Sequence, residues 1–412
     1  MSIDKPAIVG GKPVSSEKIR FTEIIMGEEE LSVVQEIMRE KSFVAGEYIE
    51  KFEKEFAHYV GSKYAIAVSN GTDSLFLLYL AYNLTFGSKI VTTPVTFIAT
   101  ASTIIRSGAV PLFADVLYDG NIDPRYVERI VEREKVNGIV VVHLYGKPVD
   151  MDPIMELAKE HNLIVIEDAA HAHGAIYKGK KAGNIGHAGS FSFYPAKVIG
   201  TAGWGGIITV NDKEIAEKIK LMRAHGELGY ITGPKDKYLH VMLGFNMRIS
   251  HIEAAVAYYQ LKRLEKFISL RRKWAKLLSE KLADIPGIKL PEDADNGRHV
   301  FYIYNILIDE EKIGWSRDDF VKALNAEGIE ARRGYHIPLH KQPLFQQINN
   351  PKINFMAHVV NYPEYKKLSL PVAEDFCKRS VWLPMHPNLN EEKVEKIAEA
   401  VKKLVYYGLH KK

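Results

Sequence analysis

The sequence predicts an α/β protein, with a mostly parallel mixed sheet between helices in a large domain and a smaller α+β domain at the C-terminal end. Short β-branched runs alternate with amphipathic segments of helical length, which is typical of strands joined by helices. Of the 412 residues, 46% are hydrophobic and 26% are charged, enough apolar material for a large core. The length favours two or three domains, or one large domain with a satellite.

The strand–helix alternation occupies the first part of the chain. After an N-terminal arm over residues 1–27, helices are expected to begin near Glu28 and Glu47. Strands are then expected at 64–68, 90–94, 110–116, 139–144 and 163–167, and helices from about 72 and at 97–107, 124–135 and 153–161. Parallel strands need crossovers of this kind, so this segment predicts the parallel part of the sheet.

From Gly189 the pattern changes. Two closely spaced strands at 190–193 and 206–210 flank a glycine-rich turn, which predicts that the sheet becomes mixed here. Helices at 212–224 and 249–284 follow, and we expect the second to be broken or bent. The rest of the chain reads as α+β, with strands at 300–307 and near 329 and 381 and helices at 317–326 and 391–404. We therefore divide the chain into an arm (1–27), a large domain (28–263) and a small domain (264–412).

Charge and apolar patterning exclude several classes of function. The 55 Lys and Arg against 51 Asp and Glu give a net charge of +4 without a basic block, so nucleic acid is not an expected partner. The longest apolar runs, such as 138–146, are about half of the ~18 residues that cross a bilayer, so no membrane partner is expected. The single cysteine, Cys377, and the absence of a leading signal segment favour the reducing cytoplasm.

Lys197 is the first candidate for covalent chemistry. It stands between an aromatic strand and a glycine-rich turn, in Ser190-Phe-Ser-Phe-Tyr-Pro-Ala-Lys197-Val-Ile-Gly-Thr-Ala-Gly-Trp-Gly-Gly206. Most lysines are solvated surface charges, but burial here would lower the pKa of the amine from ~10.4 toward neutrality. An unprotonated amine attacks carbonyls, so a Schiff base is its natural use.

Asp168 is expected at the carboxyl end of a buried strand, where open α/β sheets bind their ligands. A helix cap or a turn is its plain structural alternative. With a pyridoxal phosphate (PLP) cofactor, its carboxylate would hold a proton on the pyridine nitrogen and make the ring an electron sink. His171 could then hydrogen-bond the phenolic oxygen, while His173 is expected to be packed.

A metal site is the rival interpretation of the same segment. Asp168, His171 and His173 lie at close spacing and could be the ligands of a metal hydrolase. A second carboxylate–histidine cluster is not found nearby in the sequence, so we favour a site without metal.

Phosphate binding is expected at the turn Val68-Ser-Asn-Gly-Thr-Asp-Ser74, which joins a strand to a helix with amides and hydroxyls. Turns of this composition also begin many helices that bind nothing. Ser192 is a second donor. Phe97, at the start of a following helix, could stack on a planar ring, although the pattern alone fits the core equally well.

With these residues in view, the chain resembles the DegT/DnrJ/EryC1/StrS family of PLP-dependent sugar aminotransferases, of the fold-type I aminotransferase superfamily. The resemblance covers nearly the full length. It is carried by Asn70-Gly-Thr-Asp-Ser-Leu, Pro94-Val-Thr-Phe-Ile-Ala-Thr100, Gly108-Ala-Val-Pro-Leu-Phe-Ala-Asp115, Glu167-Asp-Ala-Ala-His171, the segment 190–206, Gly244-Phe-Asn-Met-Arg248, Pro338-Leu-His340 and Leu383-Pro-Met-His-Pro387.

The resemblance implies roles for individual residues. Lys197 would be the Schiff-base lysine and Asp168 the pyridine partner, with Phe97 stacking on the ring and His171 near its oxygen. Gly71, Thr72 and Ser192 would contact the phosphate. Asn246 would reach into the active site of a neighbouring subunit, which implies a homodimer with shared sites; Arg248 is expected to be structural.

The resemblance also implies the reaction, a transfer from glutamate or glutamine to a keto sugar, nucleotide-linked, or to a keto-cyclitol. Dehydratase relatives replace the lysine by histidine, so Lys197 favours transamination. The start Ala7-Ile-Val-Gly-Gly-Lys-Pro13 resembles members that act on cyclitols. Segments that resemble substrate-facing loops contain Tyr194, His225, Tyr335 and His340.

Two features leave other interpretations open. Trp204 stands where the family usually has Asp or Glu before Gly-Gly, which affects the local hydrogen bonding. Some members of the family were first described as regulators, so a PLP- or sugar-binding regulatory protein without useful turnover is the alternative function. A helix-turn-helix signature is absent from the sequence, which argues against direct DNA binding.

Overall fold

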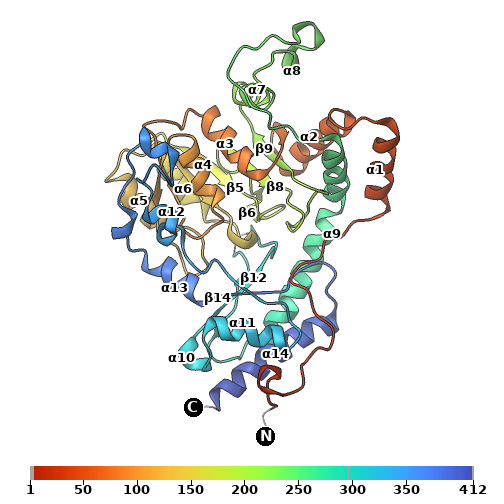
Figure 1. Ribbon diagram of the computed structural model, residues 1–412, viewed down its shortest axis with the longest axis vertical. Helices are drawn as coiled ribbons and strands as arrows, with labels where there is room; N and C mark the ends of the chain where they lie inside the picture. Colours follow the sequence, from red (N-terminus) through yellow and green to blue (C-terminus); the bar gives the residue numbers. More distant parts are fainter. Residues whose placement is uncertain (1–3, 296, 411–412) are drawn as a thin grey trace.

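A seven-stranded mixed sheet forms the centre of the protein in our computed structural model, which describes residues 4–295 and 297–410 (Figure 1). Its strand order is β1-β9-β8-β5-β4-β2-β3. The strands are β1 (Tyr64–Val68), β2 (Lys89–Thr92), β3 (Val110–Phe113), β4 (Gly138–Val142), β5 (Ile164–Asp168), β8 (Ala188–Ser192) and β9 (Gly206–Val210).

The pairing confirms the predicted change from a parallel to a mixed sheet. The strands β3, β2, β4, β5 and β8 are parallel neighbours, whereas β9 is antiparallel to both β8 and β1. Strand β1 therefore runs in the same direction as β8. All five residues of β4, Gly-Ile-Val-Val-Val, are buried, as expected for an inner strand covered on both faces.

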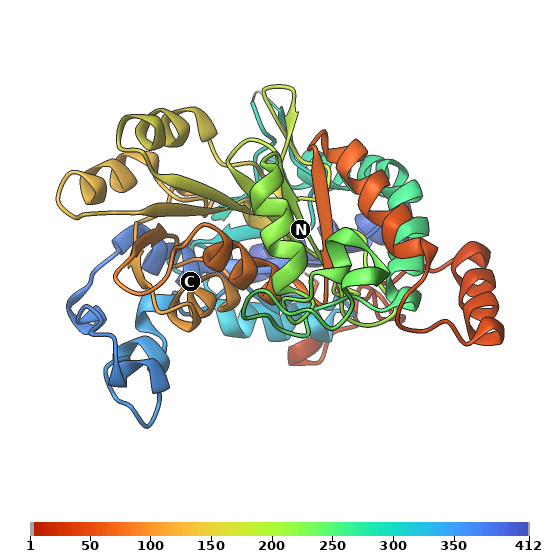
Figure 2. The same ribbon diagram turned by 90° about the horizontal axis from the view of Figure 1, so that it is seen from above.

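Helices cover both faces of this sheet (Figure 2). Those of the first two-thirds of the chain are α1 (Glu28–Glu40), α2 (Glu47–Val60), α3 (Gly71–Ala81), α4 (Ala99–Arg106), α5 (Pro124–Val131), α6 (Met151–Glu160), α7 (Lys213–Met222) and α8 (Gly229–Thr232). Apolar side chains of α3 and α7 pack on those of β1, β4, β5 and β9 in one core cluster. Helix α1 lies at one edge of the molecule in both views, and the segment around α8 projects from the top in Figure 1.

The C-terminal part contains a second, antiparallel sheet of order β10-β12-β14-β13. Its strands are β10 (Ile288–Lys289), β12 (Tyr304–Ile308), β13 (Arg332–Arg333) and β14 (Ser380–Leu383), with helices α10 (Glu310–Ile313), α11 (Arg317–Ala326), α12 (Pro343–Gln346), α13 (Pro371–Arg379) and α14 (Glu391–Leu409). A third sheet of order β11-β6-β7 combines β11 (Gly297–Arg298) with β6 (Ile176–Tyr177) and β7 (Lys180–Lys181).

Helix α9 (His251–Leu282) links the two larger sheets as one α-helix of 32 residues. The expected break in this segment is therefore wrong. A capping box fixes its start, because the Ser250 side chain accepts from the Glu253 amide while the Glu253 carboxylate accepts from the Ser250 amide. The helix contacts α1 and α2 at one end and α14 at the other, and these contacts along its length stabilise the uninterrupted helix.

The N-terminal arm is held by a buried carboxylate of the C-terminal part. Glu327 is completely buried and accepts from the backbone amides of Ala7 and Val14, at 2.7 and 2.9 Å. The Lys403 amine lies 2.9 Å from the same carboxylate. A buried charge is tolerated only when it is paired and hydrogen-bonded, so the arm is part of the packing around Glu327.

Most predicted elements are present, with shorter strands than expected. Strands β2 and β3 end at Thr92 and Phe113, two and three residues before their predicted ends. The expected strand near Ile329 is a single bridge to Ile19, and β13 follows it. Among the described residues, the helices are all too short or too polar to cross a membrane.

Candidate active site

Several of the predicted site residues lie at one edge of the central sheet, the edge at which its parallel strands end. Asp168 is the last residue of β5 and Ser192 the last residue of β8. The turn from Ser69 to Thr72 follows β1, and Lys197 comes five residues after β8. Open α/β sheets bind ligands at this edge.

The turn after β1 is held against the end of β8. A Cβ atom built on Gly71 would lie only 2.8 Å from Cβ of Ser192, so a side chain at position 71 would displace the serine. Asn70 caps α3, because its Oδ1 accepts from the Asp73 amide at 2.8 Å. The turn thus places Gly71, Thr72 and Ser192 beside the positive end of the dipole of an 11-residue helix.

Asp168 is buried and hydrogen-bonded. Thr100 Oγ1 donates to its Oδ2 at 2.8 Å, and the Ala170 amide donates to its Oδ1 at 3.2 Å. Burial raises the pKa of the Asp168 carboxyl, while these hydrogen bonds and the Lys197 charge act in the opposite direction. Thr100 and Ala170 thus hold the two oxygens of the Asp168 carboxyl in place.

Lys197 lies close enough to Asp168 for the two charges to influence one another. Burial lowers the pKa of the Lys197 amine to about 8, against the opposing effect of the Asp168 carboxylate. The Nζ atom lies 5.1 Å from the centroid of the Tyr302 ring, and the Lys197 amide donates to the Tyr194 carbonyl at 2.8 Å. The lowered pKa brings the unprotonated amine, the form that a nucleophile requires, closer to neutral pH.

His171 faces the same group of residues. Its ring lies 4.6 Å from that of Tyr302, and the Tyr145 amide donates to its Nδ1 at 3.4 Å. Burial and the Lys197 charge hold the pKa of His171 well below its usual value. A neutral ring whose Nδ1 accepts carries its proton on Nε2, so Nε2 is a hydrogen-bond donor.

His173 is packed, as expected, between the rings of Phe191 and Phe193 at 5.3 and 5.0 Å. Burial lowers the pKa of His173 to about 3, and within the described part of the chain neither ring nitrogen has a hydrogen-bond partner. In residues 4–295 and 297–410 we find no group of three or more His, Cys, Asp or Glu side chains arranged to hold a metal ion.

Two predicted substrate residues lie beside this cluster. The Tyr335 ring stacks on Tyr145 at 6.1 Å, and its pKa is raised well above the usual value, mainly by burial. Tyr194 is 45% exposed and lies 5.4 Å from the Trp204 ring. The Trp204 amide donates to Glu253 Oε1 at 2.9 Å, so a carboxylate lies next to the unusual tryptophan.

Four further residues were predicted for the site, namely Phe97, His340, His225 and Asn246. Phe97 is 58% exposed. His340 is fully buried, and its Nε2 lies 3.0 Å from the Glu374 carboxylate. His225 and Asn246 are exposed and lie at the two ends of the projecting segment; Asn246 Oδ1 accepts from the Arg248 guanidinium at 3.1 Å.

The model of the DegT/DnrJ/EryC1/StrS aminotransferase family matches residues 24–402. The chain belongs to this family. It is 38% identical over 378 residues to a "Pleiotropic regulatory protein" of Geobacillus stearothermophilus, covering 90% of this chain and 93% of the relative. It is 34% identical over 366 residues to a dTDP-3-amino-3,6-dideoxy-alpha-D-galactopyranose transaminase of Aneurinibacillus thermoaerophilus, covering 88% of this chain and 92% of the relative.

A solved structure of the family agrees in fold. NtdA of Bacillus subtilis, with bound cofactor PMP, is 27% identical and superposes with a TM-score of 0.82, covering 95% of this chain and 86% of NtdA. The predicted α/β architecture is confirmed as that of fold-type I aminotransferases. As a member of this family, the protein is a PLP-dependent aminotransferase.

The residues present fit this cofactor. The turn at Gly71 leaves a Cβ-free approach beside Ser192, at the helix end that favours an anion. The Asp168 carboxylate and the Lys197 amine influence each other's charge within the same buried site. A phosphorylated pyridine aldehyde requires an anion site, a buried carboxylate and an amine with a lowered pKa, and the site contains all three.

Three residues that contact the candidate site were given no role in the sequence interpretation. Thr100 lies in the segment 94–100 that carries the resemblance, but nothing in the pattern joins it to Asp168. Tyr302 comes from the C-terminal part, so only the folded chain brings its ring to Lys197 and His171. Tyr145 has a left-handed backbone, with φ of 56°, which the sequence does not signal because glycine is the usual residue there.

Proposed function

We propose that the protein transfers an amino group from glutamate or glutamine to a keto sugar, nucleotide-linked, with a keto-cyclitol as the alternative acceptor. The observation that carries the proposal is the proximity of the partly buried Lys197 to the buried Asp168, where desolvation lowers the pKa of the amine to about 8. The name of the Aneurinibacillus relative, a transaminase of a dTDP-linked sugar, supports the nucleotide-linked acceptor.

PLP, when bound, supplies an aldehyde and an electron-withdrawing ring. We assign Asp168 to hold a proton at the pyridine nitrogen, and His171 Nε2 to donate to the phenolic oxygen. Lys197 serves first as the nucleophile and then as the general acid and base, taking the proton from the α-carbon of the amino donor. Its lowered pKa suits both tasks, because each protonation state is populated near neutral pH.

The other predicted residues are assigned either to the cofactor or to the substrate. We assign the phosphate to Gly71, Thr72 and Ser192, and the stacking contact to Phe97, whose exposed ring is free to cover a planar cofactor. Substrate contacts are proposed for Tyr194, His225, Tyr335 and His340.

We propose a homodimer in which Asn246 completes the phosphate site of the neighbouring subunit. The projecting segment beside Asn246 exposes large apolar side chains, among them Tyr238 at 79% and Leu243 at 84%, and exposed apolar patches mark interaction surfaces. The shared sites are tested by mixing the Lys197→Ala and Asn246→Ala proteins and measuring the activity of the mixture. Hybrid dimers with shared sites would restore up to about a quarter of the parental activity, whereas self-contained sites would restore none.

The test of the reaction is an assay of the purified protein with PLP, glutamate or glutamine, and a panel of nucleotide-linked keto sugars and inososes. Appearance of the aminated product and the 2-oxo acid would support the proposal. The Lys197→Ala protein is the control, and transamination by this variant at the parental rate would refute the role of Lys197.

A regulatory protein of the same fold is the second candidate, favoured by the name of the Geobacillus relative. The absorbance spectrum of the purified protein distinguishes the aminotransferase from the regulatory protein. A yellow protein whose band shifts with glutamate supports turnover, whereas a yellow protein that does not respond supports the regulator.

The arm (1–27), the large domain (28–263) and the small domain (264–412) remain our proposed division of the chain. The single buried cysteine, Cys377, supports a cytoplasmic location.

A further inference from the structure

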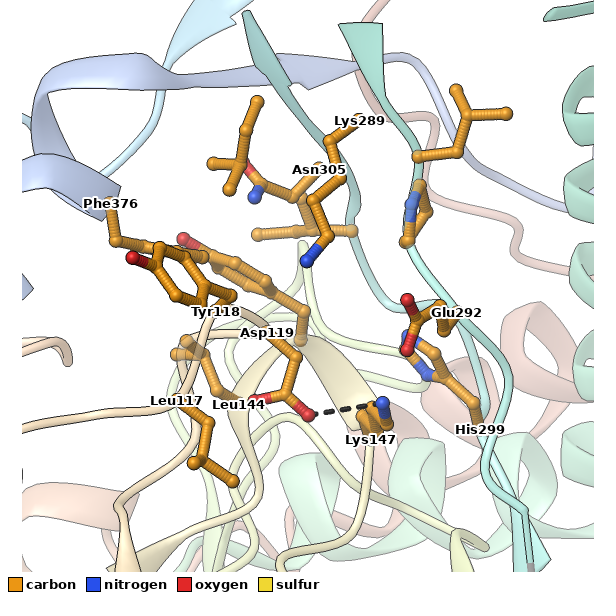
Figure 3. A pocket seen from close by; sticks show the side chains of 15 residues that line it. Leu117, Tyr118, Asp119, Leu144, Lys147, Lys289, Glu292, His299, Asn305 and Phe376 are labelled. Atoms are coloured by element: carbon orange, nitrogen blue, oxygen red, sulfur yellow. Dashed lines mark ion pairs between the residues drawn. The ribbon is translucent and has the colours of Figure 1, made fainter. Parts of the chain in front are cut away.

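A pocket away from the candidate active site lies between the central sheet and the C-terminal sheet, and Figure 3 shows it from close by. Its volume is about 230 Å³, below the ~300–1,000 Å³ of sites for drug-sized ligands. The walls come from the segments after β3 and β4, from β10 and β12 and from α13. The residues assigned to the cofactor do not line it.

Four charged side chains surround this pocket. Lys147 lies 3.0 Å from Asp119 in an ion pair. In Figure 3 the amines of Lys147 and Lys289 extend into the pocket from opposite sides, and the Glu292 carboxylate lies near His299 at the right. Burial lowers the pKa of His299 to about 3, so this ring is neutral and the charge comes from two lysines and two carboxylates.

Lys289 and Glu292 are free to bind a ligand. The Lys289 amine lies 5.3 Å from the Tyr118 ring, and neither Lys289 nor Glu292 forms an ion pair with another described residue. Both are exposed at the mouth, while Leu117, Leu144 and Phe376 line the pocket with apolar surface. The pocket therefore offers one unpaired cation, one unpaired anion and an apolar wall.

The geometry points to a second ligand site, for a small zwitterion of the α-amino acid class. Its carboxylate would bind Lys289, its ammonium would bind Glu292, and its side chain would lie against Leu117 and Phe376. Charged hydrogen bonds of this kind are the stronger ones in proteins. A nucleotide exceeds the volume, and a simple anion would leave Glu292 facing a like charge.

One residue connects this site to the active site. Tyr145 lines the pocket, and its ring stacks on His171 at 6.3 Å. An amino acid in the pocket would thus contact a residue that also borders the catalytic cluster. The inference does not depend on the acceptor or the amino donor of the proposed reaction.

The first experiment locates the ligand. Crystals of the holoenzyme are soaked in L-selenomethionine, and the anomalous signal of selenium is mapped. We expect a peak beside Leu117 and Phe376. A peak beside Lys197 alone, or the absence of any peak, would overturn the proposal.

The second experiment measures binding in solution by titration calorimetry with L-methionine. Lys289→Met and Glu292→Gln should each weaken binding at least tenfold, since each removes one charged contact. Lys54→Met is the matched control, because Lys54 is an exposed lysine of α2 that does not line the pocket. Parental affinity in both pocket variants would refute the site.

Discussion

The Nε2 atom of His143 lies 2.8 Å from Oε2 of Glu167, and both side chains are completely buried behind Asp168. The Val149 amide donates to His143 Nδ1 at 3.1 Å, so Nε2 carries the proton and donates to the carboxylate. The amides of Gly183, Ile185 and Gly186 donate to the same carboxylate, each at 2.7 Å. Glu167 thus fixes the end of β5 next to Asp168, to which we assign the pyridine proton.

Glu167→Gln should lower the free energy of unfolding by about 2–3 kcal/mol, because an amide NH₂ would face backbone donors that need an acceptor. Urea denaturation followed by circular dichroism measures the change. Exposed Glu156 on α6 provides the control, and Glu156→Gln should leave the value unchanged. Equal stability of the two variants would show that the carboxylate is dispensable.

The Lys197 amine should react with acetic anhydride in the cofactor-free protein with a midpoint near pH 8, the value to which burial lowers its pKa. Only the unprotonated amine is nucleophilic, so the rate rises as the pH rises through this value. Peptide mapping by mass spectrometry follows acetylation at Lys197 and at exposed Lys54 in one experiment. A midpoint at Lys197 near the ~10.4 of an ordinary lysine would contradict the burial effect.

Thr100→Val should weaken PLP binding about tenfold, because the lost hydrogen bond further raises the pKa of Asp168. A protonated carboxyl cannot stabilise a protonated pyridine nitrogen, so the loss should grow as the pH falls. Absorbance titration with PLP gives the dissociation constant. Thr103→Val is the control, since Thr103 Oγ1 donates within its own helix to the Ala99 carbonyl at 2.6 Å; similar losses in both variants would argue against a specific role.

His173→Leu should stabilise the protein at acidic pH. The folded pKa of His173 is about 3 against a usual value of 6.5, so between these values the unfolded chain binds the proton and stability falls as the pH falls. Removing the histidine should raise the free energy of unfolding at pH 5, relative to pH 7.5, by about 2 kcal/mol. Urea titrations at both pH values test this, with His161→Gln, on an exposed histidine, as reference.

Local sequence signals predicted the elements around the site well. Helix α11 has the predicted bounds, Arg317–Ala326, and α1 and α2 begin at the predicted residues, Glu28 and Glu47. Asp168 could be placed at the site because open α/β sheets bind ligands at the carboxyl ends of their strands. Lys197 was joined to it through the chemistry of PLP and the family resemblance, because the pattern along the chain alone does not bring the two residues together.

The partners of those residues could not be predicted in the same way. Tyr302 reaches Lys197 across the junction of the two larger sheets, and Thr100 reaches Asp168 from a different crossover helix. The expected break in α9 is wrong because packing against α1, α2 and α14 along its length outweighs local propensity. Contacts of this kind depend on tertiary structure, which a single sequence does not display.

The hydrogen bonds from the N-terminal arm to Glu327 limit how far the start of this enzyme can be truncated. A truncation that removed Ala7 to Val14 would strip two amide donors from a carboxylate without access to water, leaving Lys403 as its remaining partner. Designs that shorten the leading segment to aid crystallisation should therefore keep residues 7–14 whole.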